Sequence, residues 1–257
     1  MHQLIQYLSY WLNAVNAHSL QSPFIYDLYT NTIRSKSQHE ETSQIEVLRN
    51  KLISSNLWID VESYGASSRV ANGRKRPVNK IAKHGINPLK TNLLLWRLIN
   101  YFDLKTIVEL GTAFGINTLH LSQNKNTSIT SFEGCNNTAD IAQSNFDSLN
   151  RKNIKLVRGN LDDTLRAFCD ITRKVDFVFF DANHRYSPTV NYFELLSKRT
   201  HDKTIFVFDD IHWSKEMTKA WKEIHQSPMV TLSIDLYQLG IIMFMPTLPK
   251  QHYTITF

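Results

Sequence analysis

The segment from Thr106 to Thr118, TIVELGTAFGINT, constrains the fold of this chain more than any other stretch. An apolar strand candidate leads into Gly111, a second glycine follows at Gly115, and a polar helix start comes next. Glycines allow the tight turn and the close backbone approach to a ligand that such a strand–loop–helix unit needs. The pattern is typical of α/β proteins that hold a nucleotide-like molecule at the edge of a sheet.

Strands and helices alternate from Thr106 onward, which predicts a parallel sheet with helices on both faces. The strands we expect are Thr106–Glu109, Ser128–Glu133, Ile154–Arg158, Phe177–Asp181 and Thr204–Phe208. Two further strands, Val230–Tyr237 and Gly240–Met245, are joined by a tight connection, so they should pair as an antiparallel hairpin. The predicted fold class is α/β, with a doubly wound, mostly parallel sheet of seven strands that ends in an antiparallel hairpin.

Residues 1–103 are expected to form a helical accessory segment before a nucleotide-binding domain at 104–257. The first helix carries one apolar face, and Ser22 and Pro23 are typical of the start of a second helix. Further helices are predicted over 39–54 and 89–102. The apolar face of the first helix is made of Leu4, Ile5, Leu8, Trp11, Leu12 and Val15.

A basic loop is predicted at 57–77, because small and polar residues dominate there. Its basic side chains include Arg69, Arg74, Lys75 and Arg76. Loops of this length are often functional, so the segment is either a solvated linker or a flap that contacts an anionic substrate.

Composition narrows the class of protein further. The chain has 257 residues, of which 42% are hydrophobic, so it can bury a sizeable core. Its formal charge of +6 suits either an ordinary basic protein or one with an acidic partner. Cys135 and Cys169 lack metal-site spacing, which predicts reduced thiols in a cytoplasmic protein. No signal peptide and no membrane span are expected.

The glycine loop differs from the dinucleotide-binding pattern, because Ala113 fills the middle position and the last glycine has a different spacing. Glu109 lies two residues before Gly111, where an acid suits an ammonium group better than a phosphate. Glu133 lies 22 residues after Gly111 and closes the second strand, where it can accept both hydroxyls of a ribose. The alternative is that both glutamates are ordinary strand-end acids.

With these residues, the stretch 105–245 resembles the class I S-adenosylmethionine-dependent methyltransferases. The resemblance implies that S-adenosylmethionine is the cofactor and that Glu133 holds its ribose. The residues it implies near the methionine end are Glu109, Gly111, Thr112, Ala113 and Gly115. Gly159 and Asn160 would flank the adenine; members often carry Asp at the second position, and Asn can still bond the exocyclic amine.

Acidic and imidazole side chains follow the fourth and fifth predicted strands. Asp181 and His184 come after the fourth strand, and Asp209, Asp210 and His212 after the fifth. Carboxyl ends of parallel strands meet at one edge, where like charges repel unless a cation or a proton lies among them. Oxygen ligands of this kind favour Mg²⁺ or a similar divalent cation.

The arrangement resembles the cation-dependent O-methyltransferases, both catechol-type and sugar-type. The resemblance implies that Asp181, Asp209 and Asp210 are the metal ligands, although catechol-type enzymes usually have an amide at the last position. They also place a lysine base where His184 stands. An imidazole can replace it as general base at neutral pH, and His212 is a second base candidate or a metal ligand.

Structural roles compete with these assignments. Asp181 lies where metal-free members also keep an acid near the cofactor, so it is a catalytic, metal-binding or cofactor-binding candidate. Asp210 or Ser214 could cap the helix that follows. His212 could be a surface or structural histidine.

The function expected from the sequence is methyl transfer from S-adenosylmethionine to a hydroxyl of a small molecule, assisted by a divalent cation. One alternative is a nucleic-acid methyltransferase, which the basic residues 69–76 favour and the lack of an Asn/Asp-Pro-Pro-Tyr motif opposes. Another is a non-catalytic S-adenosylmethionine-binding module. The first helix could join two copies of the chain as a homodimer. The sequence does not identify the acceptor.

Overall fold

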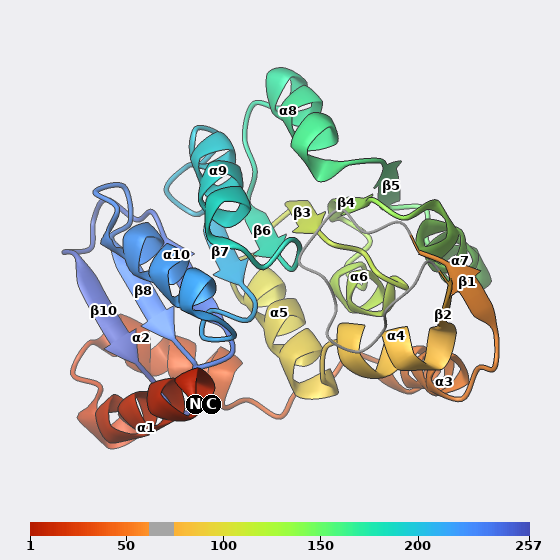
Figure 1. Ribbon diagram of the computed structural model, residues 1–257. Coiled ribbons are helices and arrows are strands. Elements are labelled where there is room, and N and C mark those ends of the chain that lie inside the picture. The colour runs from red at the N-terminus through yellow and green to blue at the C-terminus, as the bar shows by residue number, and fades with distance from the viewer. Residues whose placement is uncertain (62–74) are drawn as a thin grey trace. The chain divides into compact units, whose positions relative to one another are not determined.

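The structure, a computed structural model, describes residues 1–61 and 75–257 (Figure 1). It divides into two compact units: the first comprises residues 1–36 and 168–257, and the second comprises residues 37–167. The boundaries between the two units fall after residues 36 and 167. The predicted boundary between an accessory segment and a nucleotide-binding domain at residue 103 stays a prediction. The amino-terminal residues join the carboxyl-terminal ones in one unit because Val15 pairs with Ile255 as an isolated β-bridge.

The second unit contains three parallel strands in the order β3-β4-β5. They are β3 (Thr106–Leu110), β4 (Ser128–Glu133) and β5 (Ile154–Arg158), close to the predicted bounds. Leu110 pairs with Phe132, and Glu133 pairs with Arg158, so the carboxyl ends of neighbouring strands are in register. Their helices are α3 (Thr42–Ile53), α4 (Val78–Gly85), α5 (Leu89–Tyr101), α6 (Ile116–Leu121) and α7 (Asn136–Ser148). The helix α8 (Leu161–Ile171) begins in this unit.

The short helix α6 is the centre of the second unit, because all six of its residues are buried. Its apolar residues pack among neighbouring helices, and its polar residues Asn117, Thr118 and His120 are hydrogen-bonded. Ile45 of α3, Val78 of α4 and Phe146 of α7 belong to the same apolar cluster as Leu119 of α6. This packing holds the loop before α6 in place.

The ends of the predicted loop 57–77 form a two-stranded antiparallel sheet. Its strands are β1 (Trp58–Asp60) and β2 (Lys75–Pro77), with Trp58 opposite Pro77. Arg69 and Arg74 lie outside the described residues. Because β1 and β2 occupy the two ends of this stretch, its interpretation as a loop is wrong at those ends.

The first unit contains five strands in the order β10-β8-β9-β7-β6. They are β6 (Phe177–Phe180), β7 (Ile205–Phe208), β8 (Leu232–Asp235), β9 (Gly240–Met243) and β10 (Gln251–Thr254). The predicted hairpin is β8–β9, and β9 runs antiparallel to both of its neighbours. The additional strand β10 pairs parallel to β8. The described residues thus hold eight strands in these two runs, where seven were predicted.

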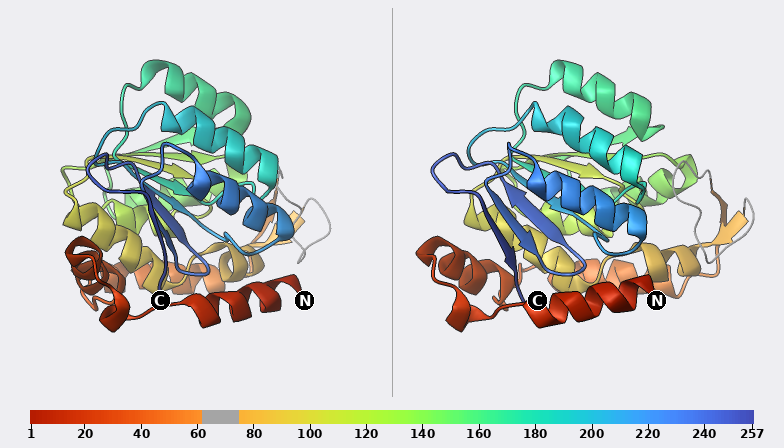
Figure 2. Two further views of the ribbon diagram at one scale, coloured as in Figure 1. Left: turned by 90° about the vertical axis from the view of Figure 1, so that its left-hand side faces the viewer. Right: turned by 60° about the vertical axis from the view of Figure 1, so that its left-hand side comes forward.

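The helices of the first unit include both the amino-terminal ones and two that follow β6 and β7. They are α1 (His2–Asn13), the 3₁₀ turn η1 (Ala17–Ser19), α2 (Pro23–Leu28), the π-helical η2 (Tyr29–Ile33), α9 (Tyr186–Ser197) and α10 (Lys215–Gln226). As predicted, Ser22 caps α2 and Pro23 is its first residue. The helices α9 and α10 pack side by side (Figures 1 and 2).

The chain therefore has the predicted α/β fold of the Rossmann-like kind, mostly parallel and with an antiparallel hairpin near its end. Strands and helices alternate along the chain from β3 to α10. Within 1–61 and 75–257, no helix is both long enough and apolar enough to cross a membrane.

Candidate functional site

Glu109 at the end of β3 is fully buried. Its carboxylate accepts hydrogen bonds from Asn117 Nδ2 at 2.6 Å, from Ser131 Oγ at 2.5 Å and from the Thr118 hydroxyl. Buried carboxylates need such donors, because an unsatisfied one would carry a large desolvation penalty. Glu109 thus ties the loop and α6 to β4, and its predicted contact with a cofactor ammonium stays a prediction.

The loop 111–115 folds through several left-handed backbone conformations. Gly111 has φ 100°, Ala113 has φ 47° and Gly115 has φ 78°. The amides of Gly111 and Thr112 both donate to Phe132 O, at 3.1 and 3.0 Å, which holds the loop against β4. At Gly115 a Cβ would also come within 2.7 Å of the Phe146 ring. The loop is therefore a tightly built turn.

Glu133 at the end of β4 binds the same loop. Its Oε2 accepts the Ala113 amide at 2.9 Å, and its Oε1 accepts the Cys135 amide at 2.9 Å. A carboxylate oxygen can accept more than one hydrogen bond. The side chain is partly exposed, unlike that of Glu109. A partly exposed carboxylate beside a glycine turn is suited to a pair of ribose hydroxyls.

Gly159 and Asn160 follow β5 at the same edge. The Gly159 amide donates to Glu133 O at 3.0 Å, and Gly159 has φ 125°. Asn160 Oδ1 accepts the Asp162 amide at 3.1 Å and its carbonyl accepts the Thr164 hydroxyl at 2.9 Å, so this residue caps α8. The structure shows this capping role. Contact between Asn160 and an adenine stays a prediction.

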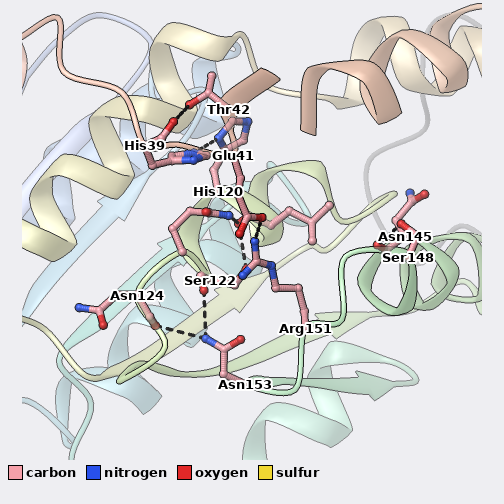
Figure 3. A network of polar contacts seen from close by, with 12 residues as sticks. His39, Glu41, Thr42, His120, Ser122, Asn124, Asn145, Ser148, Arg151 and Asn153 are labelled. Atoms are coloured by element: carbon pink, nitrogen blue, oxygen red, sulfur yellow. Dashed lines mark hydrogen bonds and ion pairs between the residues drawn. The ribbon is translucent and has the colours of Figure 1, made fainter. Parts of the chain in front are cut away.

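A polar network packs α3 against the far side of α6 (Figure 3). The fully buried His120 of α6 shares a hydrogen bond of 2.7 Å with His39, between Nδ1 and Nε2 respectively. His120 Nε2 lies 3.9 Å from Glu46 Oε1, and Arg151 pairs with Glu41. Burial, followed by the charges of His120 and Arg151, lowers the pKa of His39 to about 3. His39 is therefore neutral at physiological pH.

In the first unit, three carboxylates follow β6 and β7. Phe180 pairs with Phe208, so Asp181 and Asp209 leave their strands at the same level, and the Asp209 amide donates to Phe180 O at 2.9 Å. Asp209 is buried and Asp210 has φ 55°. Of the two predicted caps for α10, Ser214 is the one that accepts a helix amide, from Met217 at 3.1 Å.

Burial is the largest cause of the raised pKa values of Asp209 and Asp210. It raises the pKa of Asp209 well above its ordinary value, and the charges of Asp181 and Asp210 raise it further. Burial and the charge of Asp181 also raise the pKa of Asp210, while His184 opposes the shift. Both shifts have the same two causes, burial and neighbouring carboxylate charge.

His184 Nε2 lies 3.4 Å from Asp181 Oδ1. Burial alone would lower its pKa, but the bond to Asp181 and the charges of Asp181, Asp210 and Asp209 outweigh it and raise the pKa to about 9. The sequence-based prediction of His184 as general base assumed the ordinary imidazole pKa of 6.5, and the pKa of this residue is higher. His184 carries a proton at neutral pH and must lose it before it can act as a base; its role stays a prediction.

His212 forms a separate pair with Asp235 at the end of β8. His212 Nε2 and Asp235 Oδ2 are 2.7 Å apart, and both side chains are about one-tenth exposed. The ring stacks on Tyr237, with centroids 5.7 Å apart, and within the described residues its buried Nδ1 has no hydrogen-bond partner. The structure therefore shows a positioned imidazole, and leaves its predicted catalytic role untested.

The fit of a divalent cation can be judged from the same acids. Their oxygens are the ligands that Mg²⁺ prefers. Within residues 1–61 and 75–257, however, no group of three or more His, Cys, Asp or Glu side chains is arranged to hold a metal ion. The donor chemistry fits a divalent cation, and its binding at these acids stays a prediction, so we derive no step through a metal.

Sequence reasoning missed several residues of these clusters. Asn117, Thr118 and Ser131 enclose Glu109, and Asp235 holds His212. The first three could have been found from helical and strand periodicity around a buried acid. Asp235 gave no local signal, because 23 residues separate it from His212.

Comparisons with known proteins agree with this architecture. The sequence profile of a family described as "Methyltransferase domain" matches residues 108–211. That range includes the loop, Glu133, Asp181, His184 and both acids after β7. No curated protein matches the sequence significantly.

Several solved structures share the fold. One, described as a candidate caffeoyl-CoA O-methyltransferase from Staphylococcus aureus, is 17% identical, with TM-score 0.59 and coverage of 86% of this chain and 97% of that one. An O-methyltransferase from Bacillus cereus, in complex with S-adenosylhomocysteine, is 16% identical, with TM-score 0.58 and coverage of 84% and 99%. The O-methyltransferase TomG from Streptomyces achromogenes, in complex with S-adenosylmethionine, is 14% identical, with TM-score 0.58 and coverage of 85% and 95%.

At these identities the likeness establishes the fold, and the profile match identifies the domain. Both agree with the resemblance stated from the sequence. Residues 108–211 of the chain are thus similar to a family described as a methyltransferase domain, and the chain shares the fold of solved O-methyltransferases.

Proposed function

We propose that this protein transfers the methyl group of S-adenosylmethionine to a hydroxyl oxygen of a small molecule. The observation that supports this most is the turn at 111–115, which Glu133 binds through the Ala113 amide at 2.9 Å. A glycine turn allows close backbone approach to a ligand, and the partly exposed Glu133 carboxylate beside it is suited to ribose hydroxyls. The O-methyltransferases that share this fold favour oxygen as the acceptor atom.

Bound S-adenosylmethionine supplies a methyl group on a sulfonium sulfur; attack by the acceptor oxygen forms an O–C bond and breaks the S–C bond. The acceptor proton must be removed. Within the first unit, the Asp181–His184 pair and the His212–Asp235 pair are the groups that can take or hold it. Otherwise catalysis rests on proximity and orientation.

Cation assistance is a separate part of the proposal. The raised pKa values of Asp209 and Asp210 reflect burial and mutual repulsion, and a divalent cation would relieve that repulsion. Methyl transfer should then increase on addition of Mg²⁺ and disappear with a chelator. Equal rates with Mg²⁺ and with chelator would remove the cation from the proposal and leave methyl transfer intact.

The cofactor assignment is tested by calorimetry with S-adenosylmethionine and S-adenosylhomocysteine. Glu133→Gln should weaken binding about tenfold to a hundredfold, because hydrogen bonds to charged groups contribute about 1.5–3 kcal/mol. Glu40→Gln, at an exposed position of the same unit, should change nothing. Lack of affinity for both compounds in the folded wild-type protein would contradict the proposal.

The acceptor class is tested with a panel of phenols, sugars and oligonucleotides. Transfer to small hydroxylated molecules supports the proposal. Transfer only to nucleic acid, with a rate that falls steeply with salt, would replace it with the nucleic-acid alternative. Cofactor binding without transfer to any acceptor would favour a binding module.

The two buried free cysteines support a reducing compartment such as the cytoplasm.

A further inference from the structure

The helix α1 exposes an apolar face. None of its residues is buried, and the face is made of Leu4, Ile5, Leu8, Trp11 and Leu12, which are 61, 55, 50, 65 and 74% exposed. At 100° per residue these positions share one side of a helix. In both views of Figure 2, α1 lies along the outside of its unit. Large adjoining apolar surfaces on soluble proteins mark interaction sites.

The opposite side of α1 is fastened to the rest of the first unit, so the helix is not simply frayed. Tyr10 Oη donates to Ile255 O at 2.8 Å, and Gln3 Nε2 donates to Trp213 O at 3.1 Å. Tyr237 Oη donates to Gln3 O at 3.0 Å, and its ring lies edge-on to Tyr7. The face is therefore presented on an anchored helix.

The charge of α1 indicates what covers this face. From His2 to Asn13 the helix contains no Asp, Glu, Lys or Arg, although the chain as a whole carries +6. Helices that lie on membranes typically carry Lys and Arg on their polar side, and here that side is bonded to the protein. A charged partner surface would have no oppositely charged side chain to pair with on α1. A second copy of the same uncharged face needs no such pair, and it brings no like charges together along α1.

We propose that α1 joins two copies of this chain through a two-fold contact of the Leu4–Leu12 face with itself. Such a contact is isologous, so each residue of the face meets its counterpart or a neighbour. The five side chains expose roughly 600 Å² per copy, which for two copies exceeds the approximately 1,000 Å² that a specific interface needs. Trp11 is the residue type that most often anchors such contacts.

The experiment is sedimentation equilibrium of the full chain between 1 and 100 μM. The wild type should be a dimer, and the double variant Leu8→Glu/Leu12→Glu should be a monomer, with dissociation constant raised at least a hundredfold. Val47→Glu is the control, because Val47 is an exposed apolar residue on α3 (53%) and receives one glutamate outside the face. It should remain a dimer. Circular dichroism and thermal melting verify that each variant is folded.

Three results would overturn the proposal. They are a wild type that stays monomeric, a double variant that stays dimeric, and a Val47→Glu control that also dissociates. Co-sedimentation with neutral and anionic vesicles distinguishes the rival occupant. A monomer that binds vesicles through Leu8 and Leu12 assigns the face to lipid and contradicts self-association. The proposal does not depend on the methyl-transfer activity, so the two can fail separately.

Discussion

Two neighbouring positions of the loop before α6 reach left-handed conformations with different residues. Ala113 has φ 47° and carries a methyl group there, while Gly115 has φ 78° and faces the Phe146 ring. The conformation already disfavours a side chain at 115. The ring excludes one more strongly, because a Cβ would lie 2.7 Å from Cζ of Phe146.

Gly115→Ala should therefore lower the free energy of unfolding by about 1–3 kcal/mol, from overpacking and backbone strain. Urea denaturation measures this change. Gly85→Ala is the control, because nothing lies within 4 Å of a Cβ at Gly85. In a double-mutant cycle, Phe146→Leu should reduce the cost of the alanine. An unchanged cost would mean that the ring is not its source.

Among the elements, α6 is held by two separate polar sets. Glu109 binds Asn117 and Thr118 on the loop side, and His39 binds His120 on the α3 side. His39 precedes α3, so its bond connects that segment to the helix that follows the loop 111–115 (Figure 3).

The pKa of His39, about 3 in the folded protein against 6.5 ordinarily, predicts a pH dependence of stability. Between these values the unfolded chain binds a proton that the folded chain does not. Stability should therefore be fully present above pH 6.5 and decline as the pH falls toward 3, by up to about 1.4 kcal/mol per pH unit for one proton. His39→Gln should reduce this slope in urea unfolding between pH 7.5 and 4.5. His2→Gln is the control, and equal slopes in all three proteins would contradict the assignment.

At the scale of the whole molecule, ligand binding should be visible as stability. A compound that binds only the folded protein at a hundred times its dissociation constant stabilises it by about 2.7 kcal/mol. S-adenosylhomocysteine should therefore raise the melting temperature and slow hydrogen exchange in peptides covering 106–134 and 155–162. Slower exchange confined to 230–257 would place the ligand elsewhere.

The elements that could be predicted from the sequence are those with strong local patterns. The bounds of β3, β4 and β5 and the hairpin β8–β9 agree closely, and Ser22 and Pro23 mark the start of α2. The strand β10 was missed, because its sequence, QHYT, has little apolar pattern and pairs only by lying beside β8. Likewise β1 and β2 are recognisable only as a pair.

Local sequence determined the α/β alternation, the glycine turn and the strand-end acids, because periodicity and backbone freedom depend on near neighbours. Tertiary structure decided the protonation of His184, the burial of Glu109 and the pairing of His212 with Asp235. Each of these depends on desolvation and on charges from distant strands. The sequence therefore determines the chemical type of a side chain, while the folded structure determines its charge and its accessibility.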